Sequence, residues 1–179
     1  PRISKKETCF AALVFDQYES QLSCDAPHIV LHNPSDMGNL GTILRTCAGF
    51  GFADTAIILP AADVFDPRVV RASMGSLFSH RIAFFESFEA YQALHAQHMC
   101  YPFMLDGSIT LNTALKNKKQ PYSLVFGNEA TGLPAAFAEI GQPVRIPHND
   151  TIDSLNLAVA VSIAAYAFTQ DGCLVRRHH

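Results

Sequence analysis

The sequence predicts one α/β domain built on a mainly parallel sheet flanked by helices. Short apolar runs of strand length alternate along the chain with stretches of helical periodicity, and this alternation is typical of parallel α/β folds. The 179 residues are 49% hydrophobic and 16% charged, a composition that favours a buried core over disorder. We expect an N-terminal arm over residues 1–25 and a folded domain over residues 26–179.

The expected strands are short apolar runs, most of them separated by turn residues or helical stretches. Runs of this length bounded by turns fit strands of a buried parallel sheet. They comprise residues 28–32, 55–59, 81–85, 101–105, 123–126 and 144–146.

An apolar stripe at positions i, i+3, i+4, i+7 and i+8 marks the first helix, and this face should pack on the sheet. The opposite face is polar and includes Asn39 and Arg45, whose six-residue separation is roughly 9 Å along a helix axis. Both side chains are therefore expected at one site. The stripe consists of Leu40, Ile43, Leu44, Cys47 and Ala48.

Two further helices are predicted from their end signals. The second has Asp66 as its N-cap, Pro67 at its first position and Gly75 as its stop. The last begins near Asp153 and Ser154, both good cap residues, and continues as a run that is apolar nearly all round. Such a helix is expected to be buried in the core or against a second subunit.

Neither a membrane span nor a metal site is predicted. The longest apolar stretch, residues 155–168, is shorter than the roughly 20 residues that a bilayer requires, and no signal-type segment follows the N-terminus. The five cysteines are scattered without a C-x-x-C pair, so we expect no disulfides, no zinc and a reducing, cytoplasmic location. His95 and His98 lack a neighbouring cysteine or acidic partner, and we expect them on a helix surface.

The net charge of −3 and the pI of about 6.2 argue against a global electrostatic surface for nucleic acid. A local basic patch is still compatible with this balance, although each cation alone is more simply a solvated surface charge. Candidates are Lys5, Lys6, Arg68, Arg71, Lys116, Lys118, Lys119, Arg176 and Arg177.

Three segments carry polar residues and glycines where strands pass into loops or helices, the usual ligand-binding edge of open α/β sheets. They are residues 33–46, 126–133 and 146–156. Gly127 and Gly132 have the spacing of a P-loop but lack its Lys-Ser/Thr ending, and no G-x-G-x-x-G follows a strand. An NTPase or dinucleotide enzyme is therefore not expected, and the residues alone predict only an α/β protein with a polar site at its strand ends.

Together and in this order, N-P-x₄-N-x-G-x-I-x-R-T (33–46), G-N-E-x-x-G-L (127–133) and I-P…S-L-N (146–156) resemble the three motifs of the SpoU/TrmH branch of SPOUT RNA methyltransferases. Residues 71–75, R-A-S-M-G, also resemble a family segment, and the similarity covers nearly all of 28–168. The resemblance implies a C-terminal trefoil knot, S-adenosylmethionine as cofactor, a homodimer and methylation of a ribose 2′-hydroxyl in tRNA or rRNA.

The resemblance also implies which residues surround the cofactor. The two glycines among them could instead serve only to form a turn, and Ile146 and Leu155 could instead serve only to pack the core. The loop residues His148, Asn149 and Asp150 depart from the family's frequent methionine-containing sequence. The expected cofactor-binding residues are Leu105, Gly127, Gly132, Leu133, Ile146 and Leu155.

Five residues are expected to have catalytic roles. Family proposals make the arginine at the position of Arg45 the general base, but a guanidinium stays protonated in proteins. We therefore expect it to position the hydroxyl or an adjacent phosphate and to stabilise the developing alkoxide. Glu129 is expected to fix Arg45 or the loop, and Asn156 to hydrogen-bond within the site. The set is Arg45, Asn39, Glu129, Ser154 and Asn156.

Three other functions are compatible with the sequence. A SPOUT methyltransferase could act on a base nitrogen or carbon, although Asn39 with Arg45 and S-L-N favours the ribose branch. The fold could also serve as an RNA-binding protein without catalysis, which the absence of S-adenosylmethionine binding to a folded dimer would favour. An unrelated α/β ligand-binding module is the third alternative, which a structure without a C-terminal knot would favour.

Overall fold

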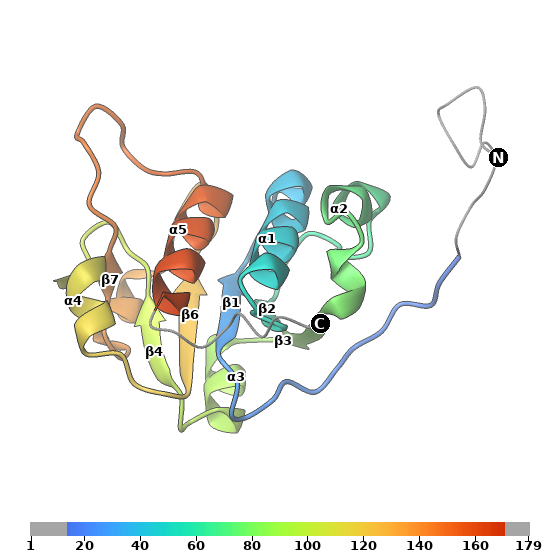
Figure 1. Cartoon of the computed structure of the whole chain (residues 1–179), viewed down its shortest axis with the longest axis horizontal. Helices are drawn as coiled ribbons and strands as arrows, with labels where there is room; N and C mark the ends of the chain where they lie inside the picture. Colours follow the sequence, from blue (N-terminus) through green and yellow to red (C-terminus); the bar gives the residue numbers. More distant parts are fainter. Residues whose placement is uncertain (1–13, 171–179) are drawn as a thin grey trace.

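A parallel sheet of five strands lies at the centre of the computed structural model, which describes residues 14–170 (Figure 1). The strand order is β3-β2-β1-β6-β4, and every pairing is parallel. This confirms the α/β class and the mainly parallel sheet. The strands are β1 (His28–His32), β2 (Asp54–Ile58), β3 (Arg81–Phe85), β4 (Met99–Pro102) and β6 (Tyr122–Phe126).

Two predicted strands differ from the structure, one in where it begins and the other in the sheet to which it belongs. The run predicted at 101–105 begins two residues earlier, as β4, because Met99 to Pro102 pair with Tyr122 to Val125 of β6. The run at 144–146 is not in the main sheet. Its first two residues form β7 (Val144–Arg145), which pairs with β5 (Ile109–Thr110) in a separate two-stranded sheet.

Helices cover both faces of the sheet. The helices α1, α2 and α5 lie on one face, where α1 packs against both of the others, and α3 lies toward the other (Figure 1). Two 3-10 helices, η1 and η2, complete the described elements. Their bounds are α1 (Met37–Gly49), α2 (Pro67–Ala72), η1 (Ser76–Ser79), α3 (Phe88–Leu94), α4 (Leu111–Lys116), η2 (Ala135–Glu139) and α5 (Leu157–Thr169).

Alternate residues of each strand enter two separate cores. In β1, Leu31 packs with the apolar stripe of α1 and with α5, whereas Val30 packs with Phe88, Tyr91 and Phe137 on the opposite face. The predicted stripe of α1 is confirmed, because Leu40, Ile43, Leu44 and Cys47 are all buried. A sheet buried on both faces explains why its strands read as continuous apolar runs.

The predicted start of α2 is correct, whereas the predicted start of α5 is not. Asp66 accepts a hydrogen bond from the Arg68 amide at 2.7 Å, and α2 begins at Pro67 as expected. The last helix does not begin at Asp153 or Ser154. Its N-cap is Asn156, whose side chain accepts from the amides of Ala158 and Val159.

The described part of the N-terminal arm lies against η1 and β3. The Tyr18 hydroxyl donates to the Leu77 carbonyl at 2.5 Å, and the Ser20 amide donates to the Ile82 carbonyl at 2.7 Å. The candidate cations Lys5, Lys6, Arg176 and Arg177 lie outside the described residues. Within residues 14–170, no helix is long and apolar enough to cross a membrane.

Candidate functional site

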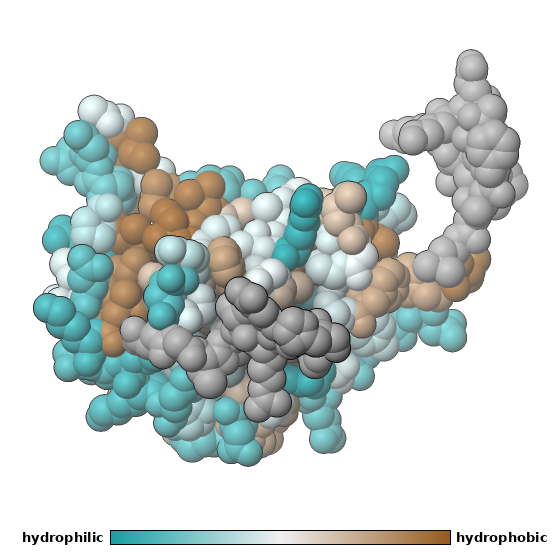
Figure 2. Space-filling model, viewed as in Figure 1, coloured by the Kyte–Doolittle hydropathy of each residue, from teal (hydrophilic) through white to brown (hydrophobic). Residues whose placement is uncertain are grey.

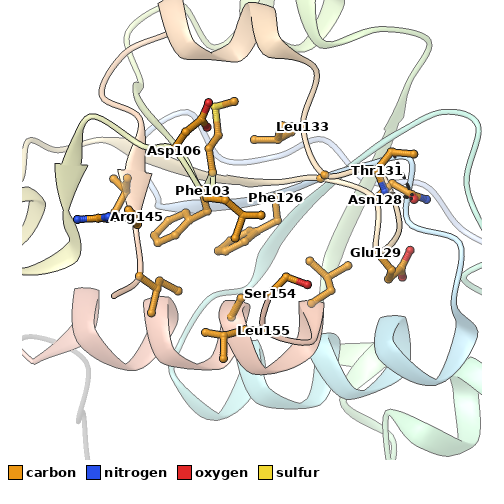
Figure 3. A pocket seen from close by; sticks show the side chains of 18 of the residues that line it. Phe103, Asp106, Phe126, Asn128, Glu129, Thr131, Leu133, Arg145, Ser154 and Leu155 are labelled. Atoms are coloured by element: carbon orange, nitrogen blue, oxygen red, sulfur yellow. Dashed lines mark hydrogen bonds between the residues drawn. The ribbon is translucent and has the colours of Figure 1, made fainter. Parts of the chain in front are cut away.

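A cavity of about 580 Å³ opens at the carboxyl ends of β4 and β6 (Figure 3). Its wall brings together the loop after β4, the glycine-bounded loop after β6 and the segment between β7 and α5. All six residues expected to surround the cofactor line it: Leu105, Gly127, Gly132, Leu133, Ile146 and Leu155. Glu129 and Ser154 of the expected catalytic set line it too.

Aromatic rings that the sequence analysis missed form one wall of this cavity. Phe103 and Phe126 stack with their ring centroids 4.6 Å apart and an interplanar angle of 13°. Figure 3 shows both rings between Leu133 on one side and Leu155 on the other. Each phenylalanine lies in an apolar run predicted as a strand, so its sequence signal was that of a core residue.

Position 127 requires glycine because the backbone of the same loop passes very close to it. A Cβ at this position would lie 2.1 Å from the Gly132 carbonyl carbon and 2.3 Å from the Leu133 nitrogen, so no other residue fits without moving the loop. Gly132 has a φ of +68°, in the left-handed region that favours glycine. The two glycines therefore fold the loop back on itself and leave its backbone open to the cavity.

Asn128 and Glu129 attach this loop to the segment before α1. The Asn128 amide donates to the Asn33 carbonyl at 2.8 Å, and its oxygen accepts from the Ala130 amide at 2.9 Å. The Glu129 carboxylate accepts from the Ser35 amide and hydroxyl and from the Asp36 amide at 2.8–3.1 Å. The first two motif segments are thereby held together.

The surroundings of Glu129 keep its carboxylate ionised. Partial burial raises the pKa of this group, but hydrogen bonds from Ser35 and Asp36 lower it, and the net pKa lies below its ordinary value. Glu129 makes no hydrogen bond or ion pair with Arg45 among the described residues. Of the two roles expected for Glu129, the geometry matches fixing the loop and not fixing Arg45.

A pair of asparagines links α1 to α5. The Asn156 amide donates to the Asn39 side-chain oxygen at 3.0 Å, while the Asn156 oxygen caps α5. Asn156 is exposed and stands at the N-cap of α5, not inside its apolar run. Asn156 directly follows Leu155, so the pair holds the third motif beside the first.

Arg45 and Ser154 are the expected catalytic residues left without structural contacts. Arg45 is exposed on α1 and does not line the cavity, and its side chain makes no hydrogen bond or ion pair within residues 14–170. Ser154 lines the cavity near the start of α5 (Figure 3). It does not cap α5, so the capping alternative for this serine is wrong.

The loop that departs from the family sequence contributes His148 to the cavity wall. One ring nitrogen of His148 lies 2.9 Å from the Ile146 carbonyl, which fixes the loop near β7. Asn149 and Asp150 are exposed and do not line the cavity.

Among the candidate basic residues, several are engaged within the chain. Arg68 pairs with Asp66 at 2.9 Å on the surface, and the Lys118 ammonium donates to the Phe168 carbonyl at 2.9 Å. Arg71 is exposed on α2, and Lys119 is exposed in the loop after α4. The described candidate cations therefore lie on α2 and in or after α4 and do not line the cavity.

Two histidines that were expected on a surface are buried. His95 is 5% exposed and His98 is 6% exposed, and both rings pack against His28 at the amino-terminal edge of the sheet. Because His28 is distant from both residues in the sequence, the local pattern did not reveal that they are buried.

Comparisons with known proteins agree with the motifs. The sequence model of the SpoU rRNA Methylase family matches residues 26–166. The chain is 33% identical over 144 residues to the tRNA (cytidine(34)-2′-O)-methyltransferase of Escherichia coli, covering 78% of this chain and 89% of that protein. It is 31% identical to the 23S rRNA (adenosine(1067)-2′-O)-methyltransferase of Streptomyces laurentii, covering 77% of this chain but 52% of that protein.

The fold has solved counterparts. An AdoMet-bound rRNA methyltransferase from Sinorhizobium meliloti superposes with a TM-score of 0.74 at 33% identity, covering 84% of this chain and 57% of that one. Residues 26–166, which the family model matches, include all five strands of the central sheet and every residue that lines the cavity. On these grounds the chain belongs to the SpoU rRNA Methylase family.

Proposed function

We propose that this chain transfers a methyl group from S-adenosylmethionine to the ribose 2′-hydroxyl of a structured RNA, either tRNA or rRNA. The observation that carries the proposal is the cavity, which gathers all six residues expected to surround the cofactor from the second and third motifs and from the loop after β4. Relatives named as tRNA and rRNA 2′-O-methyltransferases support the reaction and the substrate class.

The cavity fits the cofactor in size and chemistry. Its volume of about 580 Å³ lies within the range of small-molecule sites. Leu133, Ile146 and Leu155 supply an apolar surface for the adenine, and the open backbone at Gly127 and Gly132 supplies hydrogen-bonding groups for its polar edge.

The remaining polar residues act on the RNA or on the shape of the site. S-adenosylmethionine supplies the methyl group, which passes from its sulfur to the ribose oxygen as the hydroxyl proton is lost to solvent. Because Arg45 is exposed and does not line the cavity, we assign its guanidinium to the bound RNA, where it would stabilise charge on the ribose oxygen or hold a phosphate.

Asn39, Asn156 and Glu129 position the site. The amide pair Asn156–Asn39 holds the end of the third motif against α1, and Glu129 holds the start of α1 against the cavity loop. Ser154 presents a hydroxyl from the cavity wall, where a bound donor or ribose can reach it.

We also propose the homodimer and the trefoil knot. Large apolar side chains on α5, Val159 at 47% and Tyr166 at 52%, are exposed and suit a second copy. A knot is supported by the path of the C-terminal segment. It pairs with Ile109 and Thr110 through β7 and then passes the 127–133 loop before α5 packs on α1. A crystal structure of the protein tests both features, and its trace through residues 127–157 decides the knot.

The proposed reaction places the protein with cytoplasmic RNA. The test is methyl transfer from a labelled donor to total RNA of cells that lack the protein. We expect label in a discrete tRNA or rRNA, and a Leu133→Arg variant, which puts a charge into the cavity, should lose both transfer and donor binding. A folded protein that binds no donor would favour the non-catalytic RNA-binding function.

A further inference from the structure

Three buried imidazoles meet at the edge of the sheet opposite the cofactor cavity. His28 is the first residue of β1, His95 is the C-cap of α3, and His98 directly precedes β4. Their exposures are 0%, 5% and 6%. In Figure 1 this is the lower end of the sheet, where β1 starts near α3. The proposed methyl transfer uses none of these residues.

The geometry of the three rings suits a metal ion. One nitrogen of each ring lies within 4.8 Å of a nitrogen of both others, and the ring centroids are 4.3–5.4 Å apart. A tetrahedral zinc ion with Zn–N bonds of about 2.0–2.1 Å holds its nitrogens about 3.3 Å apart. The rings therefore need to close by only about 1.5 Å at most.

Two of the rings are already oriented as metal-binding histidines usually are. A nitrogen of His28, Nε2, lies 2.7 Å from the Ser23 carbonyl, and Nε2 of His98 lies 2.8 Å from the Cys24 carbonyl. A carbonyl can only accept, so both rings carry a proton on Nε2 and present a lone pair at Nδ1. Donation of the second ring nitrogen to a backbone carbonyl is the common outer-shell contact of metal ligands.

Two hydroxyl groups lie beside these Nδ1 atoms, and together they have one proton too few for their three hydrogen bonds. Nδ1 of His28 lies 2.8 Å from the Tyr91 hydroxyl, and Nδ1 of His98 lies 2.9 Å from the Ser123 hydroxyl. If each hydroxyl donates to its imidazole, no proton is left for the 2.5 Å contact between the two hydroxyl oxygens. A cation bound to the Nδ1 lone pairs would free both hydroxyl protons, one of which could then serve that contact.

The third ring adds an independent sign of a missing ligand. Nδ1 of His95 is buried without a hydrogen-bond partner among the described residues, a costly arrangement unless something binds there. The Asp54 carboxylate favours positive charge at the rings of His28 and His95.

We propose that His28, His95 and His98 bind one Zn²⁺ ion at the amino-terminal edge of the sheet. A set of imidazoles without carboxylates suits zinc and similar transition metals, and does not suit Mg²⁺ or Ca²⁺. The ion would connect β1, the end of α3 and the start of β4, so its role is to stabilise the fold away from the cavity.

The test uses the full chain after dialysis against a chelator. Titration with Co²⁺ should give the visible absorption of a tetrahedral site at one equivalent, and Zn²⁺ should abolish that absorption. Zn²⁺ at about 100 times its Kd should raise the Tm by roughly 5–10 °C. Because Nδ1 of His95 has no partner to lose, His95→Gln should fold normally and lose both responses.

His32→Gln is the matched control, because His32 lies at the other end of β1 and outside the cluster; it should respond to both metals like the natural chain. The terminal histidines His178 and His179 are present in every variant, so only differences between variants count. The proposal is overturned if the natural chain gives no cobalt absorption and no Tm increase, or if His95→Gln responds equally. It is also overturned if NMR shows an imidazolium in the metal-free cluster at pH 7 and no metal binds, since the missing charge is then a proton.

Discussion

At the level of single residues, Asn128, Glu129 and Asn156 use their side chains to hold the motif segments together. Asn128 and Glu129 bind the segment that leads into α1, and Asn156 caps α5 while it contacts Asn39. These polar groups are satisfied within the chain, which leaves Arg45 and Ser154 available for ligands. We therefore expect substitutions at Arg45 to affect chemistry much more than folding.

Arg45→Ala should lower methyl transfer by roughly 100- to 1000-fold, the usual effect of removing one group that stabilises developing charge. The free energy of unfolding should stay within about 0.5 kcal/mol of the natural value, because the side chain is exposed and makes no hydrogen bond or ion pair within the described residues. Arg45→Lys should recover only part of the activity, since lysine lacks the planar guanidinium. Full turnover by Arg45→Ala, or loss of donor binding measured by calorimetry, would contradict the assigned role.

Gly127→Ala should damage the cofactor cavity. The new Cβ meets backbone atoms at 2.1–2.4 Å, so the loop must shift, and we expect a loss of about 1–3 kcal/mol in stability together with weaker donor binding. Gly49→Ala is the control, because its Cβ meets nothing within 4 Å at the end of α1. That variant should be unchanged or more stable by up to about 1 kcal/mol. Urea unfolding and calorimetry measure both effects, and equal behaviour of the two variants would refute the close-approach argument.

His80 should make stability depend on pH. Burial lowers the pKa of His80, although its contact with the Leu44 carbonyl and the charge of Asp54 oppose this. The folded chain then binds a proton less readily than the unfolded chain, so stability is full above about pH 6.5 and falls at lower pH by up to about 1.4 kcal/mol per pH unit. The Tm difference between the natural chain and His80→Gln should therefore shrink from pH 7 to pH 5. A difference that stays constant would show that this ring titrates normally.

At the level of elements, the sequence predicted what depends on local spacing. The stripe of α1, the cap of α2 and the strands β1 and β3 were correct because periodicity and capping act between near neighbours. The start of α5 was misplaced because Asp153, Ser154 and Asn156 are all good caps, and the choice of Asn156 goes with its contact to Asn39, 117 residues away.

The difference between local and distant contacts also explains which site residues the sequence predicted. The motif residues predicted the cofactor-binding side chains, and all six meet in one cavity. Phe103 and Phe126 were missed because an aromatic residue at a strand end looks the same whether it faces a core or a ligand. The burial of His95 and His98 was missed because it depends on His28, which precedes them by more than 60 residues.

The exposed face of α5 should hold two copies together. Figure 2 shows hydrophobic residues gathered over this helix, and Val159 and Tyr166 are the large exposed ones. We expect a dimer by size exclusion with light scattering, and a monomer for Val159→Asp. Leu94→Asp is the control, since Leu94 is 68% exposed on α3, away from α5, and its variant should remain dimeric. A dimer that survives Val159→Asp unchanged would place the interface elsewhere.

At the level of the whole molecule, the parallel sheet separates two chemical regions. Its carboxyl edge carries the glycine loop, the aromatic wall and the motif asparagines, and its amino edge carries the buried histidines. Because parallel strands all end at the same edge, three segments distant in sequence are gathered around one cavity. Metal at the amino edge should therefore change stability more than turnover.

The most direct test of the proposed reaction identifies the atom that receives the methyl group. RNA labelled by the protein is digested to nucleosides and analysed by mass spectrometry, which separates a methylated ribose from a methylated base. We predict a single 2′-O-methylated nucleoside that disappears with Arg45→Ala while donor binding persists. A base-methylated product would contradict the account.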